Sequence, residues 1–281
     1  MDFPIRETIE KRRSVRTYET RPLSREDRER LTSYAARIEN PFGVPVRIGL
    51  SETERSEQPK KLGTYGVIKG AGSFLGVAAP QDKLGLEAAG YAMEKLVLYA
   101  THLGLGTCWL AGTLNREGFA RAMHTGEDEW MPAITPVGYA AEKPSFHEQL
   151  MRSTMKSARR KPWKELFFRA DFKTPLTEAD AGAYAEPLEL LRLLRLAPSA
   201  TNAQPWRVVM DGQFFHFYAV VGKEALAANP PAIQRVDGGI GACHFHLSAQ
   251  DKGLRGAFER LEGRSADAPE GWRYLFSWVK A

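Results

Sequence analysis

Four polar side chains lie between two prolines, Pro198 and Pro205, where a leucine-rich helical pattern stops and a strand pattern begins. They are Ser199, Thr201, Asn202 and Gln204. The prolines disfavour a helix on either side, and the polar groups offer donors and acceptors to a ligand. A polar loop held between two packed elements is typical of a preorganised binding site. An ordinary helix-to-strand turn has the same composition.

A cluster of basic residues follows a short expected helix, Ile5 to Lys11. It contains Arg12, Arg13, Ser14 and Arg16. Guanidinium groups and a hydroxyl that converge at one place would bind a phosphate through charge-assisted, often bidentate hydrogen bonds. A second basic run begins with Arg159 and Arg160. For both runs the alternative is a solvated basic face of the protein.

The chain has few patterns that would supply acid–base, nucleophilic or metal chemistry. It has no GxSxG motif, its two cysteines lie in no CxxC motif, and its histidines lack metal-ligand spacing. The run Gly238-Gly239-Ile240-Gly241 does not follow a strand, as a dinucleotide fingerprint must. Anion-binding groups without acid–base machinery suit a protein whose chemistry belongs to a bound cofactor.

The composition is that of a packed globular protein. The chain has 281 residues, of which 43% are hydrophobic and 10% aromatic. It shows no signal peptide and no apolar run long enough to span a membrane, so we expect a soluble, cytoplasmic protein without a membrane partner. The net charge of +5 suits a small anionic ligand. No basic run is interleaved with aromatic residues, and we expect no nucleic-acid partner.

The patterning predicts a mixed fold of helices and strands. We expect helices at 24–38, 86–103, 116–123, 187–196 and 237–252, and strands at 44–50, 73–79, 133–140, 206–211, 214–221 and 273–279. Asp211-Gly212 between two strand patterns indicates a hairpin. The fold class is therefore α+β, with antiparallel or mixed sheets rather than a Rossmann sheet.

The chain also repeats itself. A helical pattern at 88–100 that leads to Gly104 returns at 237–249 and leads to Gly253, with a constant offset of 149 residues. Both copies begin with small residues, which allow two helices to approach closely, although two amphipathic helices can also match by chance. We predict two related halves, 1–170 and a shorter 171–281, with the boundary near Asp171.

Five motifs together resemble those of the FMN-dependent nitroreductase family. They are Arg12–Arg16, Gly104–Trp109, Pro136–Tyr139, Arg160–Pro162 and Pro198–Trp206. The resemblance implies the family's α+β fold, in which two subunits usually build FMN sites at their interface. Here the motifs of one subunit lie in the first half, and the partner's loop lies in the second. The chain therefore resembles a fused subfamily, a pseudo-dimer with one complete FMN site that would be a monomer.

The resemblance also implies roles for individual residues. Arg12, Ser14 and Arg160 would bind the FMN phosphate, with Arg13 or Arg159 as further candidates, and Arg16 would lie near the pyrimidine edge of the ring. Backbone groups would approach the edge of the ring that accepts hydride; they belong to Leu110, Ala111 and Gly112. The second half would contact the ring and ribityl chain through Pro198, Ser199, Ala200 and Asn202.

The function implied is that of an FMN-dependent oxidoreductase. NADH or NADPH would deliver a hydride and leave, and a small organic acceptor would then take the electrons from the same open face, in a ping-pong mechanism. The alternative is a flavin-binding protein without turnover that acts as a store, a sensor or an assembly factor. Loss of one of the two sites makes a further loss of activity conceivable. The sequence implies no catalytic side chain, because the flavin would perform the chemistry.

Overall fold

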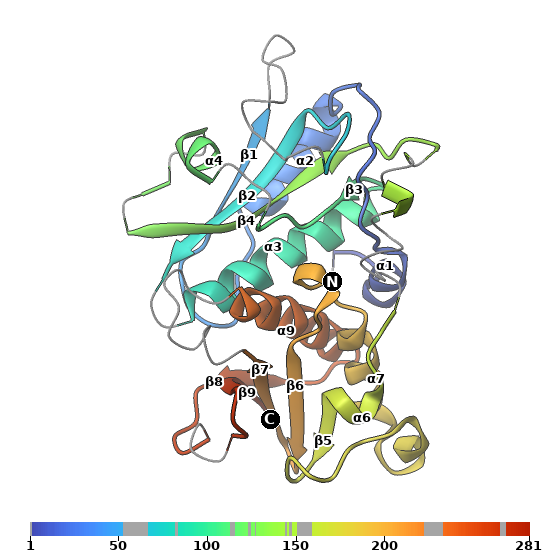
Figure 1. The fold of residues 1–281 in the computed structure, drawn as a ribbon, viewed down its shortest axis with the longest axis vertical. Helices are drawn as coiled ribbons and strands as arrows, with labels where there is room; N and C mark the ends of the chain where they lie inside the picture. The colour runs from blue at the N-terminus through green and yellow to red at the C-terminus, as the bar shows by residue number, and fades with distance from the viewer. Residues whose placement is uncertain are drawn as a thin grey trace.

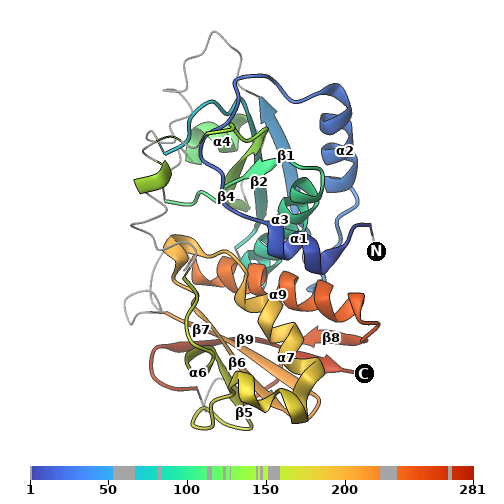
Figure 2. The same cartoon turned by 90° about the vertical axis from the view of Figure 1, so that its right-hand side faces the viewer.

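The computed structural model has two β-sheets, with the long helices α3 (Gly85–His102) and α9 (Gln234–Asp251) side by side between them (Figure 1). The structure describes residues 2–52, 67–81, 84–112, 116–122, 125–126, 128–143, 145, 148–150, 159–221, 233–264 and 268–281. In the views of Figures 1 and 2, the four-stranded sheet lies above the helix pair and the five-stranded sheet lies below it.

The first half contains a four-stranded sheet with strand order β1-β2-β4-β3. Its elements are α1 (Ile5–Lys11), α2 (Arg25–Ala35), β1 (Arg47–Glu52), β2 (Ser73–Pro80), α3 (Gly85–His102), β3 (Gly106–Thr107), α4 (Arg116–Ala122) and β4 (Glu129–Gly138). All pairs of strands within this sheet are antiparallel. The strand that the sequence predicts at 133–140 begins earlier than expected, at Glu129.

The rest of the chain, from Trp163 onward, contains a five-stranded sheet with strand order β5-β6-β7-β9-β8. Its elements are α6 (Trp163–Leu166), β5 (Phe167–Arg169), η1 (Glu178–Asp180), α7 (Ala181–Arg195), η2 (Ala200–Asn202), β6 (Trp206–Asp211), β7 (Phe214–Val220), α9 (Gln234–Asp251), β8 (Gly256–Glu259) and β9 (Trp272–Lys280). The predicted hairpin at Asp211-Gly212 is present, with Gly212 in the left-handed region at φ +58°.

The two sheets share one topology. The order β6-β7-β9-β8 repeats β1-β2-β4-β3, and α9 follows β7 as α3 follows β2. The additional strand β5 pairs in parallel with β6, so the second sheet is mixed. Because β5 ends at Arg169, the chain enters the second sheet just before the boundary predicted near Asp171. The α+β class with two related halves is confirmed.

Glycine allows the backbones of α3 and α9 to come into contact. A Cβ atom on Gly90 would overlap the carbonyl oxygen of Val236, and one on Gly239 would overlap that of Glu87. Gly239 lies 149 residues after Gly90, and Val236 lies 149 after Glu87. The two close contacts are thus related by the same offset as the sequence repeat, as expected for a pair of helices with approximate twofold symmetry.

The helix pair is also joined by a buried ion pair. Arg235 on α9 donates from Nε and Nη2 to the two carboxylate oxygens of Glu87 on α3, over 2.7 and 2.6 Å. The side chains are 9% and 1% exposed. Around them, a single hydrophobic cluster includes Leu96 of the first half and Phe245 of the second. The halves therefore share one core and do not form independent domains.

We predict that Gly239→Ala destabilises the fold, because the new methyl group would force two helix backbones apart. The expected loss is about 1–3 kcal/mol of unfolding free energy, measured by urea denaturation. Gly241→Ala on the same helix is the matched control. Its Cβ would lie 3.6 Å from Trp206, an ordinary contact, and alanine favours a helix by up to about 1 kcal/mol. Equal effects of the two substitutions would contradict the close contact.

Candidate functional site

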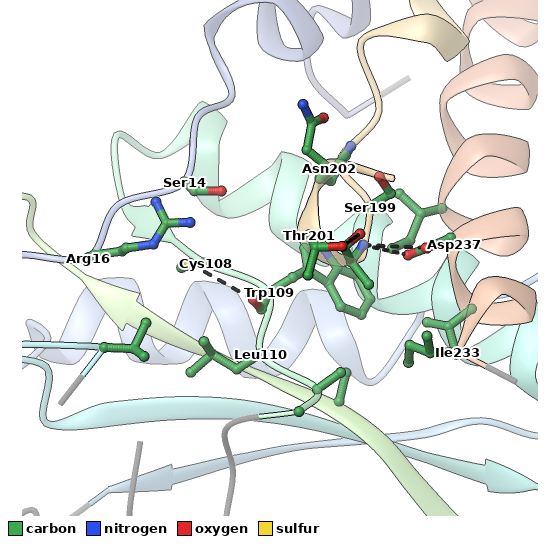
Figure 3. A pocket seen from close by; sticks show the side chains of 18 of the residues that line it. Ser14, Arg16, Cys108, Trp109, Leu110, Ser199, Thr201, Asn202, Ile233 and Asp237 are labelled. Carbon is green, nitrogen blue, oxygen red and sulfur yellow. Dashed lines mark hydrogen bonds between the residues drawn. The ribbon is translucent and has the colours of Figure 1, made fainter. Parts of the chain in front are cut away.

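Residues from both halves line one pocket of about 220 Å3 beside the helix pair (Figure 3). Most of the residues that the sequence predicts for a site lie along its wall. They are Arg12, Ser14, Arg16, Leu110, Ala111, Gly112, Arg160, Pro198, Ser199, Ala200 and Asn202. Arg13 and Arg159 are exposed and do not line the pocket. The tertiary structure thus brings together segments that lie almost 200 residues apart.

The basic run after α1 lies in the pocket because it runs along β3. The chain becomes extended at Arg12, with φ −57° and ψ 126°. Ser14 forms a parallel bridge with Thr107, and the amide of Val15 donates to the carbonyl oxygen of Thr107 over 2.8 Å. Side chains of an extended segment alternate between two sides. Arg12, Ser14 and Arg16 therefore face the pocket, whereas Val15 is buried in the core and Arg13 is exposed.

Glu94 is a buried carboxylate that connects the basic run to both halves. One of its oxygens accepts a hydrogen bond from Nε1 of Trp109 over 2.7 Å. The other lies 2.8 Å from Nε2 of His244 on α9 and 3.9 Å from Nε of Arg12. The sequence showed Glu94 only as one residue of an amphipathic helix. The fold brings its carboxylate close to Arg12 and His244, which lie far from it in the sequence.

Positive charge is concentrated on one side of the pocket. Nε of Arg12 is buried and has no hydrogen-bond partner in the described part of the chain. Burial lowers the pKa of Arg12, and the charge of Glu94 opposes that change. Burial, together with repulsion from Arg12 and Arg195, lowers the pKa of Arg160 to about 10. An anion between Arg12 and Arg160 would relieve this repulsion. The donor set therefore suits a phosphate group.

The polar loop of the second half has a strained backbone. Thr201, Asn202 and Gln204 have φ values of +49°, +58° and +47°, in the left-handed region. This conformation costs roughly 1–2 kcal/mol at each residue other than glycine. Within the loop, the amide of Gln204 donates to Oγ of Ser199 over 2.8 Å. Such strain persists only where the surrounding contacts fix it, as is common at binding sites.

Contacts between the loop and the second basic run hold this conformation. Oε1 of Gln204 accepts a hydrogen bond from the amide of Lys161 over 2.9 Å, and Nδ2 of Asn202 donates to the carbonyl oxygen of Arg159 over 3.0 Å. Nη2 of Arg160 donates to the carbonyl oxygen of Leu196 over 3.1 Å. Gln204 is 3% exposed, so it holds the backbone of the loop and does not face a ligand, which the sequence could not distinguish.

The segment after β3 places small residues at the pocket. Leu110 exchanges backbone hydrogen bonds with Ile134 of β4 over 2.9 Å in both directions. This bridge fixes the backbone that leads into Ala111 and Gly112. Gly112 is exposed, and nothing lies within 4 Å of the position that a Cβ atom would take. A ligand can therefore approach the backbone here without meeting a side chain.

Asp237 is an acid in the pocket wall that the sequence analysis did not identify. It lies on α9, is 2% exposed, and accepts a hydrogen bond from the amide of Ala200 over 3.1 and 3.3 Å at its two oxygens. Burial raises the pKa of Asp237 to about 7, and the hydrogen bond opposes that rise. In the sequence, the signal that could have identified Asp237 was an acidic residue among small and apolar residues of a helix.

The place that corresponds to the polar loop across the pseudo-twofold axis contains aromatic rings. The α2–β1 loop is the topological counterpart of the polar α7–β6 loop, and it carries Phe42. The ring of Phe42 packs against Phe276, Phe258 and Tyr91, with centroids 5.0, 5.2 and 6.0 Å away. Tyr91 is the counterpart, 149 residues earlier, of the pocket residue Ile240. Among the described residues, packed aromatic rings therefore stand at the place that corresponds to the polar loop.

Other site types find no support in the described residues. No group of three or more His, Cys, Asp or Glu side chains is arranged to hold a metal ion in that part of the chain. Both Cys108 and Cys243 are buried free cysteines. Among the described helices, none has the length and apolar character needed to cross a membrane.

The fold and the pocket between the halves define a fused nitroreductase-like protein. Residues 4–249 match a family model described as "Putative TM nitroreductase", and the chain belongs to this family. A "putative nitroreductase" of known structure from Thermotoga maritima matches with 20% identity and a TM-score of 0.62, over 99% of this chain and 94% of that one. The nitroreductase family to which the motifs point is thus confirmed.

Two further solved structures match about half of the chain. An FMN-dependent nitroreductase from Clostridium difficile matches 50% of this chain and 90% of its own, with 19% identity and a TM-score of 0.40. A nitroreductase with bound FMN from Bacteroides fragilis matches 50% of this chain and 91% of its own, with 17% identity and a TM-score of 0.40. A comparison with curated proteins finds no match.

Proposed function

We propose that the pocket binds one FMN and that the protein is an FMN-dependent oxidoreductase. It would pass electrons from NADH or NADPH to a small organic acceptor in a ping-pong mechanism. The observation that carries the proposal is the convergence of the basic run, the second basic run and the polar loop in one pocket between the halves. When bound, FMN would supply the redox chemistry. The proposal also draws on the family to which the chain belongs.

The phosphate would be held by Arg12, Ser14 and Arg160. Arg12 offers a buried Nε–H that has no acceptor within hydrogen-bond distance in the described residues, and Arg160 is a second, partly buried cation. Charge-assisted hydrogen bonds to phosphate are the strong ones. Arg13 and Arg159 are exposed, and we assign them at most a long-range electrostatic contribution.

Arg16 would lie near the pyrimidine edge of the flavin ring. Its side chain is 7% exposed, and its backbone amide donates to Oε2 of Glu148 over 3.2 Å. A fixed positive charge there would favour negative charge on the ring. Backbone groups of Leu110, Ala111 and Gly112 would approach the ring from the first half.

The second half would contact the flavin through its loop, by way of Pro198, Ser199, Ala200 and Asn202. The contacts of Asn202 and Gln204 with the second basic run fix the loop before a ligand arrives, which lowers the entropy lost on binding. One chain supplies both sides of the pocket, so we infer that a monomer has a complete site.

Variants on opposite sides of the pocket should weaken FMN binding. Arg12→Ala removes a charge-assisted contact, for which we expect a loss of about 1.5–3 kcal/mol, or roughly 10- to 100-fold in Kd. Asn202→Ala should weaken binding by at least about threefold, because the strained loop loses its bond to Arg159. Fluorescence titration of the protein with FMN measures both effects.

Matched controls for these variants lie outside the pocket. Arg25→Ala removes an exposed arginine, and Asn40→Ala removes the asparagine of the counterpart loop, whose Nδ2 donates to the carbonyl oxygen of Val44. Both should bind FMN as tightly as the parent chain. Unchanged affinity in Arg12→Ala and Asn202→Ala would show that the pocket is not the flavin site.

We predict one FMN per chain, because the described residues at the counterpart place include the ring of Phe42, packed against Tyr91, Phe258 and Phe276. The ratio of flavin absorbance to protein concentration in reconstituted, desalted protein measures the stoichiometry. Two molecules per chain would contradict the assignment of a single site.

We predict that NADH or NADPH removes the yellow colour of the FMN-bound protein under anaerobic conditions within seconds, and that a nitroaromatic compound or a quinone restores it. Rapid-mixing absorbance spectroscopy measures both steps. Bound flavin that neither nucleotide reduces would instead support a flavin-binding protein without turnover.

A further inference from the structure

We infer that Asp237 is a catalytic residue that donates a proton to the electron acceptor. The inference rests on the proposed function and assigns a side chain to a step that the resemblance leaves without one. The carboxyl group of Asp237 lies in the wall of the same pocket, next to the polar loop (Figure 3).

Asp237 lies across the pocket from two residues of the basic run. In Figure 3, Ser14 and Arg16 lie on one side of the pocket, and Asp237 lies on the other. Its neighbours on α9 that line the pocket are the apolar residues Ile233, Val236 and Ile240. A proton donor in this position faces the part of the pocket where an uncharged organic acceptor would be buried.

The hydrogen bonding of Asp237 leaves capacity for a proton. Its one donor in the described part of the chain is the amide of Ala200, shared between the two oxygens. A carboxylate offers about four acceptor positions. The protonated acid can keep the bond to Ala200 at one oxygen and carry a hydrogen on the other. The loop bond therefore does not prevent Asp237 from acting as an acid.

The charged groups near Asp237 do not hold it in its ionised form. On α3, Glu87 is bound to Arg235 and Glu94 to Trp109 and His244. The cations that line the pocket are Arg12, Arg16 and Arg160. None of the described cations forms an ion pair with Asp237. Burial dominates, and its pKa is raised from 3.8 to about 7, so that the acid is partly protonated at neutral pH. A general acid works best when its pKa lies near the working pH.

The balance of the reaction requires such a proton. Transfer of a hydride equivalent from NAD(P)H to a quinone forms one new bond to hydrogen and leaves a negative charge on an oxygen. The O–H bond of Asp237 then breaks, its proton binds that oxygen to give the quinol, and the carboxylate regains a proton from water. NAD(P)H is oxidised, the quinone is reduced, and one proton is taken from solvent in each turnover.

The test separates acid catalysis from a structural role in the loop. FMN-bound protein is reduced anaerobically with dithionite, so that nucleotide use is bypassed, and is then mixed with menadione. For Asp237→Asn we expect reoxidation to slow by about 100-fold near pH 6, because general acids contribute roughly that factor or more. The parent chain should slow as the pH rises through about 7, and the variant should show no such dependence. Asparagine keeps an oxygen that can accept the hydrogen bond from Ala200.

Two further variants complete the design. Asp251→Asn changes an exposed acid at the end of the same helix and should reoxidise as the parent chain does. Asp237→Ala removes both the acid and the acceptor of the Ala200 hydrogen bond. Slow reoxidation of Asp237→Ala together with normal reoxidation of Asp237→Asn would show that Asp237 only holds the loop, and would overturn the inference.

A readout without any acceptor checks the titration itself. The folded protein binds a proton at Asp237 that the unfolded chain releases, so the stability of the parent chain should fall relative to Asp237→Asn as the pH rises from about 4 to about 7. Parallel stability curves would overturn the inference. A protein that binds FMN but is not reduced by NAD(P)H contradicts only the proposed donor. A protein that binds no FMN overturns both proposals.

Discussion

The close contact between α3 and α9 is the constraint on which the rest of the structure depends. At Gly90 and Gly239 the two helices approach until a side chain of one would overlap the backbone of the other. This approach sets the distance between the two sheets. It also brings the basic run at the end of α1 near the polar loop at the end of α7, with Glu94 of one helix beside His244 of the other. The pocket lies between the halves because the two helices approach so closely that a methyl group would not fit at Gly90 or Gly239.

The two halves share a topology, but they differ in which groups surround the helix pair. On one side, arginines, a strained polar loop and Asp237 surround a pocket. On the other side, Phe42, Tyr91, Phe258 and Phe276 pack together. Apolar rings exclude water and add to the shared core, whereas the pocket keeps buried cations at a cost in solvation. One symmetric frame thus has packed aromatic rings on one side and a pocket lined by charged and polar groups on the other.

Strain and charge in the pocket have the same physical consequence. Left-handed residues in the loop and the repulsion between Arg12 and Arg160 both raise the free energy of the empty pocket. Contacts such as those from Gln204 to Lys161 offset these costs and keep the geometry. A ligand that brings negative charge lowers the energy of the arginines without having to reorganise the loop, and this is the advantage of a preorganised site.

The sequence by itself determined the local elements and the repeat, because hydrophobic periodicity and turn residues act over short distances. The helix pair, the hairpin at Asp211-Gly212, the α+β class and the family were all predictable. We expected the helix α7 to begin at Pro187, because a proline is common in the first turn of a helix. It begins earlier, at Ala181. Only the tertiary structure decided that Arg13 points away from the pocket, that Gln204 supports the loop, that Glu94 lies beside Arg12, and that Asp237 lines the pocket. Burial and cross-half contacts give these side chains their roles, and no local pattern encodes either.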